Sequence, residues 1–196
     1  MKKRIVILGG GESGVGAALL CKQQGYDVFL SDGGKLKESY QQELTSYGIE
    51  FEQAGHTIEK ILSADEVMKS PGIPNSNAIV KSIVENKIPI ISEMELAYRH
   101  KGGSKIIGIT GSNGKTTTTM LCYHILQKAG FNVGLGGNIG KSYARQVAEN
   151  DFEIEAILKI QSSVKGVLFS LFFKPKDFVY IILLFFTTAT ERPMTG

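Results

Sequence analysis

The chain has 196 residues, of which 42% are hydrophobic and 21% charged, and its net charge is +3, as in an ordinary soluble globular protein. This length suffices for one large domain or one and a half typical ones, with a core that needs no disulfides. The small charge argues against a nucleic-acid-binding surface, and the longest apolar run, 178–186, is about half of a membrane span.

The two cysteines, Cys21 and Cys122, lie in apolar patterns of helical period. We therefore expect two buried thiols in a reducing compartment. The first apolar stretch, VILGGG, is too short and too rich in glycine for the core of a signal peptide. These features predict a cytoplasmic monomer that binds neither nucleic acid nor membrane.

Short apolar runs and helix-forming stretches alternate over the first hundred residues. Residues 4–8 (RIVIL) stop at three glycines, as a buried parallel strand does, and a helix over 15–24 follows, closed by Gly25. The alternation predicts an α/β fold, with a Rossmann-like parallel sheet over 1–100 and right-handed crossovers. Its other expected elements are strands over 26–31, 49–55, 65–74 and 88–92, helices over 36–47 and 77–85, and a helix from 93 that runs into a Gly-Gly-Ser joint ending at 104.

A second unit is expected over 105–196. A strand over 105–110, a glycine turn and a helix over 115–129 predict the start of an incomplete P-loop-type ATP-binding domain, and FNVGLGG (131–137) predicts its next strand. From residue 151 the composition changes, because seven of the 10 phenylalanines but only two of the 23 glycines lie there. Turn-forming residues become scarce, so the fold signal weakens in this tail.

The first glycine turn, GGGESG over Gly9–Gly14, matches G-x-G-x-x-G between a strand and a helix, and Asp32 follows at the end of the next strand. Glycines let the backbone approach a diphosphate, which the free N–H groups and the dipole of the helix N-terminus attract. A tight turn that needs positive φ is the alternative. A dinucleotide is the usual ligand, although any nucleotide diphosphate satisfies the same physics.

The second turn, GSNGKTT, indicates a triphosphate site. Its backbone N–H groups would wrap the phosphates, Lys115 would face the β- and γ-phosphates, and the Thr116 hydroxyl would reach Mg²⁺. The pattern is a shortened P-loop, because Ile109 stands where the full motif has glycine. The alternative, a lysine that merely starts a helix, is disfavoured by the helix dipole. The predicted ATP-binding residues are Gly111, Ser112, Asn113, Gly114, Lys115, Thr116 and Thr117.

Three weaker signals remain. Asn138 lies where a strand opens into a loop, which suits either a ligand contact or a turn. Ser70, before Pro71-Gly72, could belong to a strand-ending turn. No histidine has the spacing of a metal ligand or a nucleophile partner.

Taken with the segments KSPGIP, SEMELAYR and GLGGNIG, the two turns resemble the Mur ligase family of peptidoglycan synthesis, in particular its D-glutamate-adding members, from Met1 to about Glu149. The resemblance implies ATP and Mg²⁺ as cofactors, and UDP-N-acetylmuramoyl-L-alanine and D-glutamate as substrates joined through an acyl-phosphate. It places Ser13 near the diphosphate, Asp32 near the uridine, and Ser70 and Asn138 at further substrate contacts. Lys115 would serve catalysis, and Thr116 would hold the metal.

The tail departs from this family. Members of the family have an LE-[IL]-SSFQL segment whose glutamate helps to hold Mg²⁺. The matching position in this chain is Lys159, and a cation repels the metal. The NITPDH segment, the carbamylated lysine and the C-terminal domain are missing, and no histidine follows His124. We therefore expect a truncated or frame-shifted chain without ligase activity. A non-catalytic nucleotide-binding fragment is the alternative, and an NAD-dependent oxidoreductase would leave the second turn unexplained.

Overall fold

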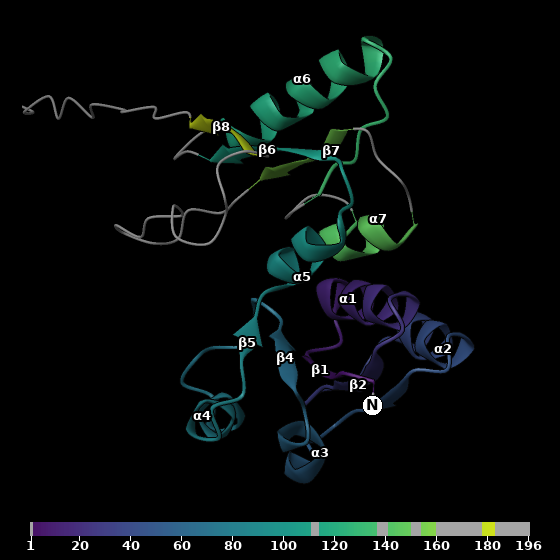
Figure 1. Ribbon diagram of the computed structural model, residues 1–196, viewed down its shortest axis with the longest axis vertical. Coiled ribbons are helices and arrows are strands. Elements are labelled where there is room, and N and C mark those ends of the chain that lie inside the picture. The colour runs from purple at the N-terminus through teal and green to yellow at the C-terminus, as the bar shows by residue number, and fades with distance from the viewer. Residues whose placement is uncertain (1, 111–113, 137–140, 150–153, 160–177, 183–196) are drawn as a thin grey trace, which may run out of the picture. The chain divides into compact units, whose positions relative to one another are not determined.

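The computed structural model describes residues 2–110, 114–136, 141–149, 154–159 and 178–182 (Figure 1). Strands and helices alternate, as the sequence predicts. In chain order the elements are β1 (Arg4–Leu8), α1 (Glu12–Gln23), β2 (Asp27–Ser31), α2 (Glu38–Ser46), β3 (Glu50–Glu52), α3 (Ile58–Leu62), β4 (Glu66–Lys69), α4 (Ala78–Glu85), β5 (Ile90–Ile91), α5 (Glu93–His100), β6 (Lys105–Thr110), α6 (Lys115–Lys128), α7 (Tyr143–Glu149), β7 (Ile154–Lys159) and β8 (Phe178–Ile182).

The chain divides into two compact units. The first comprises Met1–Ser104 and Gly140–Glu153, and the second comprises Lys105–Ile139 and Ile154–Gly196. The break after Ser104 lies at the end of the Gly-Gly-Ser joint. Helix α7 groups with the first unit, although the sequence places its residues after that joint. The first unit is therefore discontinuous in sequence.

The first unit is built on a five-stranded parallel sheet with the order β3-β2-β1-β4-β5. The chain runs outward from β1 through β2 to β3 and then returns to the other side of β1 with β4, so the topological switch lies between β1 and β4. The register pairs Leu8 with Ser31 on one side and with Lys69 on the other, which brings the carboxyl ends of three strands to one edge. The predicted Rossmann-like α/β fold is confirmed.

Helices cover both faces of this sheet. Val6 and Leu8 of β1 pack in one cluster with Ile61 of α3 and Ile83 of α4. All residues of α1 between Gly14 and Cys21 are buried, and Figure 1 shows α1 on the side of the sheet away from α3 and α4. Because alternate side chains of a strand point to opposite faces, the apolar run RIVIL supplies both halves of the core.

Helix α7 is anchored in the first unit by ion pairs and by a close backbone approach. The guanidinium of Arg145, whose side chain is 7% exposed, donates to Glu12 over 2.8 Å and to both carboxylate oxygens of Glu43. A Cβ at Gly16 would lie 2.1 Å from Ser142 Oγ and 2.9 Å from the Arg145 backbone nitrogen, so only glycine lets α1 and α7 approach this closely. Because the guanidinium is buried, removal of either side of this contact would leave a charge without its partner.

The second unit contains a three-stranded parallel sheet with the order β7-β6-β8. The predicted strand over 105–110 is observed as β6, and α6 starts at Lys115, also as predicted. Residues 178–182 of the apolar run in the tail form β8. The apolar side chains of Leu121 and Ile125 on α6 are exposed.

Four local expectations were wrong. Helix α1 begins at Glu12, three residues before the predicted start at Val15, because the turn passes directly into the helix. The five-residue α3 was missed, since so short a helix shows no periodicity. In place of the strand over 131–137, the described part forms a single bridge at Val133, in keeping with the weakness of glycine-rich strands. Cys122 is half-buried and not buried as expected, whereas Cys21 is buried as expected, which raises the pKa of its thiol to about 12.

Within the described ranges, no helix is long and apolar enough to cross a membrane.

We predict that Arg145→Ala lowers the free energy of unfolding by about 3 kcal/mol. This is the lower end of the range for a broken buried ion pair, because Glu12 and Glu43 are partly exposed and can be hydrated. The matched control is Lys141→Ala, which breaks an exposed pair with Glu149 and should cost less than about 1 kcal/mol. Denaturant unfolding of both variants measures the difference, and equal midpoints would contradict the anchoring role of Arg145.

Candidate functional site

The turn between β1 and α1 presents backbone donors at the carboxyl edge of the first sheet. Gly9 has a φ of +94°, and a Cβ at Gly14 would lie 1.8 Å from the Gly9 carbonyl oxygen. The N-cap residue of α1 is Gly11, which has no side chain that could occupy the first N–H groups of the helix. These N–H groups and the positive end of the helix dipole suit a diphosphate.

Asp32 holds two glycine turns together at this edge. Its Oδ2 accepts a hydrogen bond from Gly10 N over 2.5 Å, and its Oδ1 accepts one from Gly34 N over 2.7 Å. The carboxylate therefore contacts the Gly9–Gly14 turn on one side and the turn after β2 on the other. In G-x-G-x-x-G sites an acid at this position lies beside the ribose of the ligand.

Ser70 lies at the topological switch. It follows β4, its backbone nitrogen donates to Leu8 O over 2.9 Å, and its hydroxyl donates to Gly9 O over 3.4 Å. A Cβ at Gly9 would lie 2.8 Å from Ser70 Oγ, so the serine packs directly on the turn. Ligands of open parallel sheets bind at such switch points, beyond the carboxyl ends of the strands.

Ser13, in the first turn of α1, contacts a buried acid that the sequence did not single out. Its side chain is hydrogen-bonded to Glu93, which also accepts hydrogen bonds from the backbone nitrogens of Ala144 and Tyr143. Burial raises the pKa of the Glu93 carboxyl above its usual range, although these hydrogen bonds oppose the shift. Ser13, Asp32 and Ser70 thus lie around one turn, while Asn138 is outside the described residues.

Glu12 adds a second acid beside the turn. Burial favours its neutral form, but hydrogen bonds from Ser142 N and the Arg145 guanidinium outweigh burial and hold the pKa of Glu12 below its usual value. Glu12 and Arg145 were also missed by sequence reasoning, because their partners are more than 100 residues away. The ion pair offsets a negative charge that would otherwise repel an anionic ligand.

The second turn has the strand–turn–helix context that a phosphate loop needs. Strand β6 ends at Thr110, and Gly114 is the N-cap of α6 with a φ of +73°, a conformation that favours glycine. Lys115 is half-buried, whereas Thr116 and Thr117 are exposed. Gly111, Ser112 and Asn113 are outside the described residues. The part that is described fits a nucleotide phosphate.

The fit to Mg²⁺ is poorer. Thr116 offers one hydroxyl, and the described residues contain no group of three His, Cys, Asp or Glu side chains that could hold a metal ion. Lys159 ends β7 and pairs in register with Ile109 of β6, so its backbone lies at the end of the second sheet where β6 leads into the turn before α6. A metal-binding acid is expected there, and a lysine cannot replace it.

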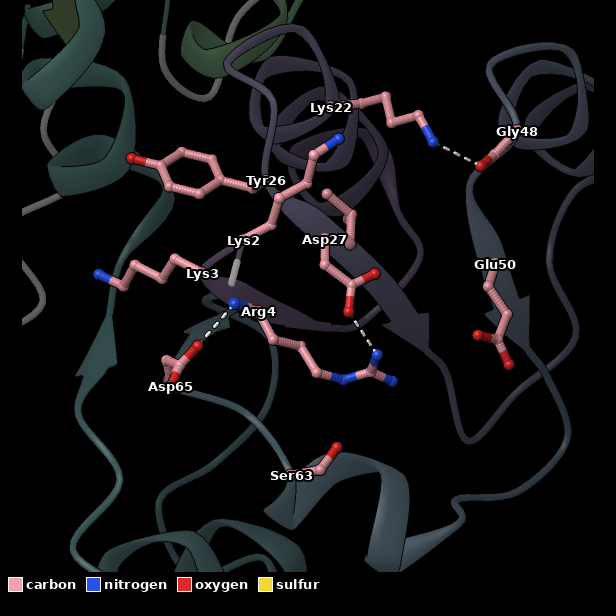
Figure 2. A pocket seen from close by; sticks show the side chains of 11 residues that line it. Lys2, Lys3, Arg4, Lys22, Tyr26, Asp27, Gly48, Glu50, Ser63 and Asp65 are labelled. Carbon is pink, nitrogen blue, oxygen red and sulfur yellow. Dashed lines mark hydrogen bonds and ion pairs between the residues drawn. The ribbon is translucent and has the colours of Figure 1, made fainter.

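A cavity of about 980 Å³ lies at the opposite, amino end of the first sheet (Figure 2). Several charged groups of its lining are paired within the unit: Arg4 donates to Asp27 over 2.6 Å and, through its backbone nitrogen, to Asp65 over 2.7 Å. Lys22 donates to Gly48 O over 2.7 Å. These contacts hold neighbouring segments of the first unit together, so the candidate site is sought at the carboxyl edge of the sheet.

Comparisons with known proteins agree with this geometry. The MurD N-terminal domain matches residues 4–79, and the Mur ligase middle domain matches residues 109–168, beyond residue 149. The UDP-N-acetylmuramoylalanine–D-glutamate ligase of Cytophaga hutchinsonii is 59% identical over 148 residues, which are 75% of this chain and 33% of that protein. The ligase of the same name from Bacteroides fragilis is 56% identical, over 79% of this chain and 35% of that protein. The one from Bacillus thuringiensis is 39% identical, over 92% of this chain and 40% of that protein.

Solved structures show the same fold. The UDP-N-acetylmuramate:L-alanyl-gamma-D-glutamyl-meso-diaminopimelate ligase from Neisseria meningitides superposes with a TM-score of 0.55 at 24% identity, over 81% of this chain and 52% of that one. A pseudomurein peptide ligase type C from Methanothermus fervidus gives a TM-score of 0.50 at 29% identity, over 81% and 33%. The chain spans 33–35% of the two most similar relatives described above.

We predict that Gly14→Ala lowers the free energy of unfolding by about 3 kcal/mol, because the new Cβ meets backbone atoms of Gly9 that cannot move aside. Gly11→Ala is the control: its Cβ meets nothing within 4 Å, and alanine at an N-cap costs about 1 kcal/mol or less relative to glycine. Thermal and denaturant unfolding compare the two. A Gly14→Ala variant as stable as Gly11→Ala would show that the turn is wider than described.

Proposed function

Because this chain belongs to the Mur ligase family, we propose that it represents the nucleotide-binding portion of an ATP-dependent ligase that joins D-glutamate to UDP-N-acetylmuramoyl-L-alanine. The observation that carries the proposal is the presence of two glycine turns, each between a parallel strand and a helix and each in its own unit. One turn suits a diphosphate and the other a triphosphate. An amide-forming ligase with a UDP-linked substrate needs both.

In the first unit, the N–H groups at the start of α1 would bind the diphosphate of the UDP substrate. Asp32 would orient the nucleoside from the end of β2, and Ser70 would face the ligand from the switch point. The Ser13 hydroxyl has one proton, which it can give to Glu93 or to the phosphate. Protonation of Glu93 would free the Ser13 proton for the phosphate, and the raised pKa of Glu93 favours that state.

In the second unit, Gly114 to Thr117 would bind ATP, which supplies the phosphoryl group that activates the substrate carboxylate. Lys115 would neutralise negative charge at the β- and γ-phosphates, and Thr116 would contribute one oxygen to Mg²⁺. Gly114 is the N-cap of α6 and makes no side-chain capping hydrogen bond, so the N–H groups at the start of the helix would be available to the phosphates. Positioning and charge stabilisation are the contributions that phosphoryl transfer needs from a protein.

Catalysis by this chain is not expected, because Lys159 stands at the carboxyl end of β7, where the resemblance to the family places a metal-binding acid. A nucleotide-binding fragment without ligase activity therefore stays the second candidate. An NAD-dependent oxidoreductase is no longer favoured, because family membership accounts for both turns.

We predict that Lys115→Ala weakens ATP binding by about tenfold to a hundredfold, the loss of one charge-assisted contact. Lys128→Ala, an exposed lysine at the other end of α6, is the control and should leave ATP affinity unchanged. Asp32→Ala should show the reverse selectivity, with weaker UDP binding and the same ATP binding. Calorimetry with ATP and UDP tests all three variants, and unchanged ATP affinity in Lys115→Ala would refute the assignment.

We also predict that the purified chain releases no phosphate when mixed with ATP, Mg²⁺, D-glutamate and UDP-N-acetylmuramoyl-L-alanine. Lys159 stands where the resemblance to the family places a metal-binding acid, and the described residues contain no group of three His, Cys, Asp or Glu side chains that could take its place. The Lys115→Ala variant sets the background of the assay. Phosphate release above that background would show that the chain supplies metal ligands beyond Thr116.

A further inference from the structure

His56 lies at the carboxyl edge of the first sheet, beside the turn that follows β2. A Cβ built on Gly33 would lie 2.9 Å from His56 Nε2, so the ring approaches the turn only because residue 33 is a glycine. Gly33 directly follows Asp32, which accepts a hydrogen bond from the backbone nitrogen of Gly10 in the Gly9–Gly14 turn. The imidazole therefore lies at the end of the site where a nucleoside would extend from the diphosphate.

A chain of hydrogen bonds determines which nitrogen of His56 carries the proton. Ser31 Oγ donates to Glu52 Oε1 over 2.6 Å, and Glu52 also accepts from Thr57 N over 2.8 Å and from Thr57 Oγ1 over 2.6 Å. Burial favours the neutral acid, but the hydrogen bonds from Ser31 and Thr57 outweigh it and hold the pKa of Glu52 below its usual value. Glu52 is therefore an ionised acceptor.

The single proton of Ser31 is used in the bond to Glu52. At 2.7 Å from His56 Nδ1, the Ser31 oxygen must then accept, so Nδ1 carries a hydrogen. In this tautomer Nε2 carries a lone pair and can accept a hydrogen bond. Within the residues that the structure describes, Nε2 has no hydrogen-bond partner of its own.

We propose that His56 Nε2 is a specificity-determining hydrogen-bond acceptor for an N–H or O–H donor on the nucleoside of the ligand. This inference rests on the proposed function, since it concerns the site that would hold the UDP substrate. A uridine nucleotide offers two such donors, the imide N3–H of the base and the ribose 2′-hydroxyl. Asp32 already accepts hydrogen bonds from Gly10 and Gly34, so His56 supplies a further acceptor beside it.

Two variants separate this role from simple packing. His56→Asn keeps an N–H group near the Nδ1 position, and with it the contact to Ser31, but has no atom at the Nε2 position. His56→Gln places an amide near Nε2 and can restore the acceptor. Calorimetry on the full chain would use UDP, 2′-deoxy-UDP and N3-methyl-UDP, and His124→Asn on exposed α6 is the matched control.

We expect His56→Asn to weaken UDP binding about fivefold to tenfold, as for one neutral hydrogen bond, with partial recovery in His56→Gln. The analogue that lacks the relevant donor should bind the wild-type chain more weakly by the same factor and should lose nothing further in His56→Asn. That analogue identifies the donor as the base imide or the ribose hydroxyl. ATP binding should not change in any variant.

A measurement on the wild-type chain removes any dependence on the folding of the variants. With ¹⁵N-labelled histidine, the Nε2 resonance of His56 should shift when UDP is added, while that of His124 stays in place. Equal losses for all three ligands in His56→Asn, or an unmoved Nε2 resonance in the UDP complex, would overturn the inference alone. A wild-type chain that does not bind UDP would overturn the proposed function and this inference with it.

Discussion

The first unit depends on the contact between the Gly9 carbonyl and the Cα of Gly14. Because neither residue has a side chain, only three residues are needed between the end of β1 at Leu8 and the start of α1 at Glu12. The same turn receives Asp32 through Gly10 and Ser70 through Gly9, so each neighbouring strand is tied to it at its carboxyl end. A wider turn would separate these contacts and the helix dipole that they surround.

Electrostatics place a second condition on this turn. Three acids from different helices, Glu12, Glu43 and Glu93, lie around α7, and an anionic ligand would be repelled if their charges were not met. Arg145 pairs with the first two, and backbone N–H groups of α7 hydrogen-bond the third. The positive potential at the start of α1 is thus maintained by a segment that lies 130 residues further along the chain.

Local signals predicted most of the fold. Apolar runs that stop at glycines marked β1 and β2, and Asn77 marked the start of α4, where its side chain caps the helix. The position of Asp32 followed from the spacing of a known motif. The sequence did not predict α3, because five residues are too few to show a helical period. It wrongly predicted a strand around Val133, because the apolar pattern looks regular although glycines weaken the strand.

Of the candidate site, the sequence predicted only the residues proposed to contact the ligand. Its supporting residues, Arg145 and Glu93 among them, act through partners distant in sequence, which no local pattern reveals.

The discontinuity of the first unit has a consequence for synthesis. A ribosome releases the chain from its N-terminus, so the five-stranded sheet can form while β6 and α6 are still being made. Until α7 has been synthesised, Glu12 and Glu43 lack the guanidinium of Arg145, and α1 lacks the close contact that Gly16 makes with α7. The first unit is therefore incomplete until α7 has been synthesised, and α7 follows the glycine turn between β6 and α6 in the sequence. A pause in translation before Glu149 would leave the five-stranded sheet formed, but without the contacts that α7 makes with α1 and α2.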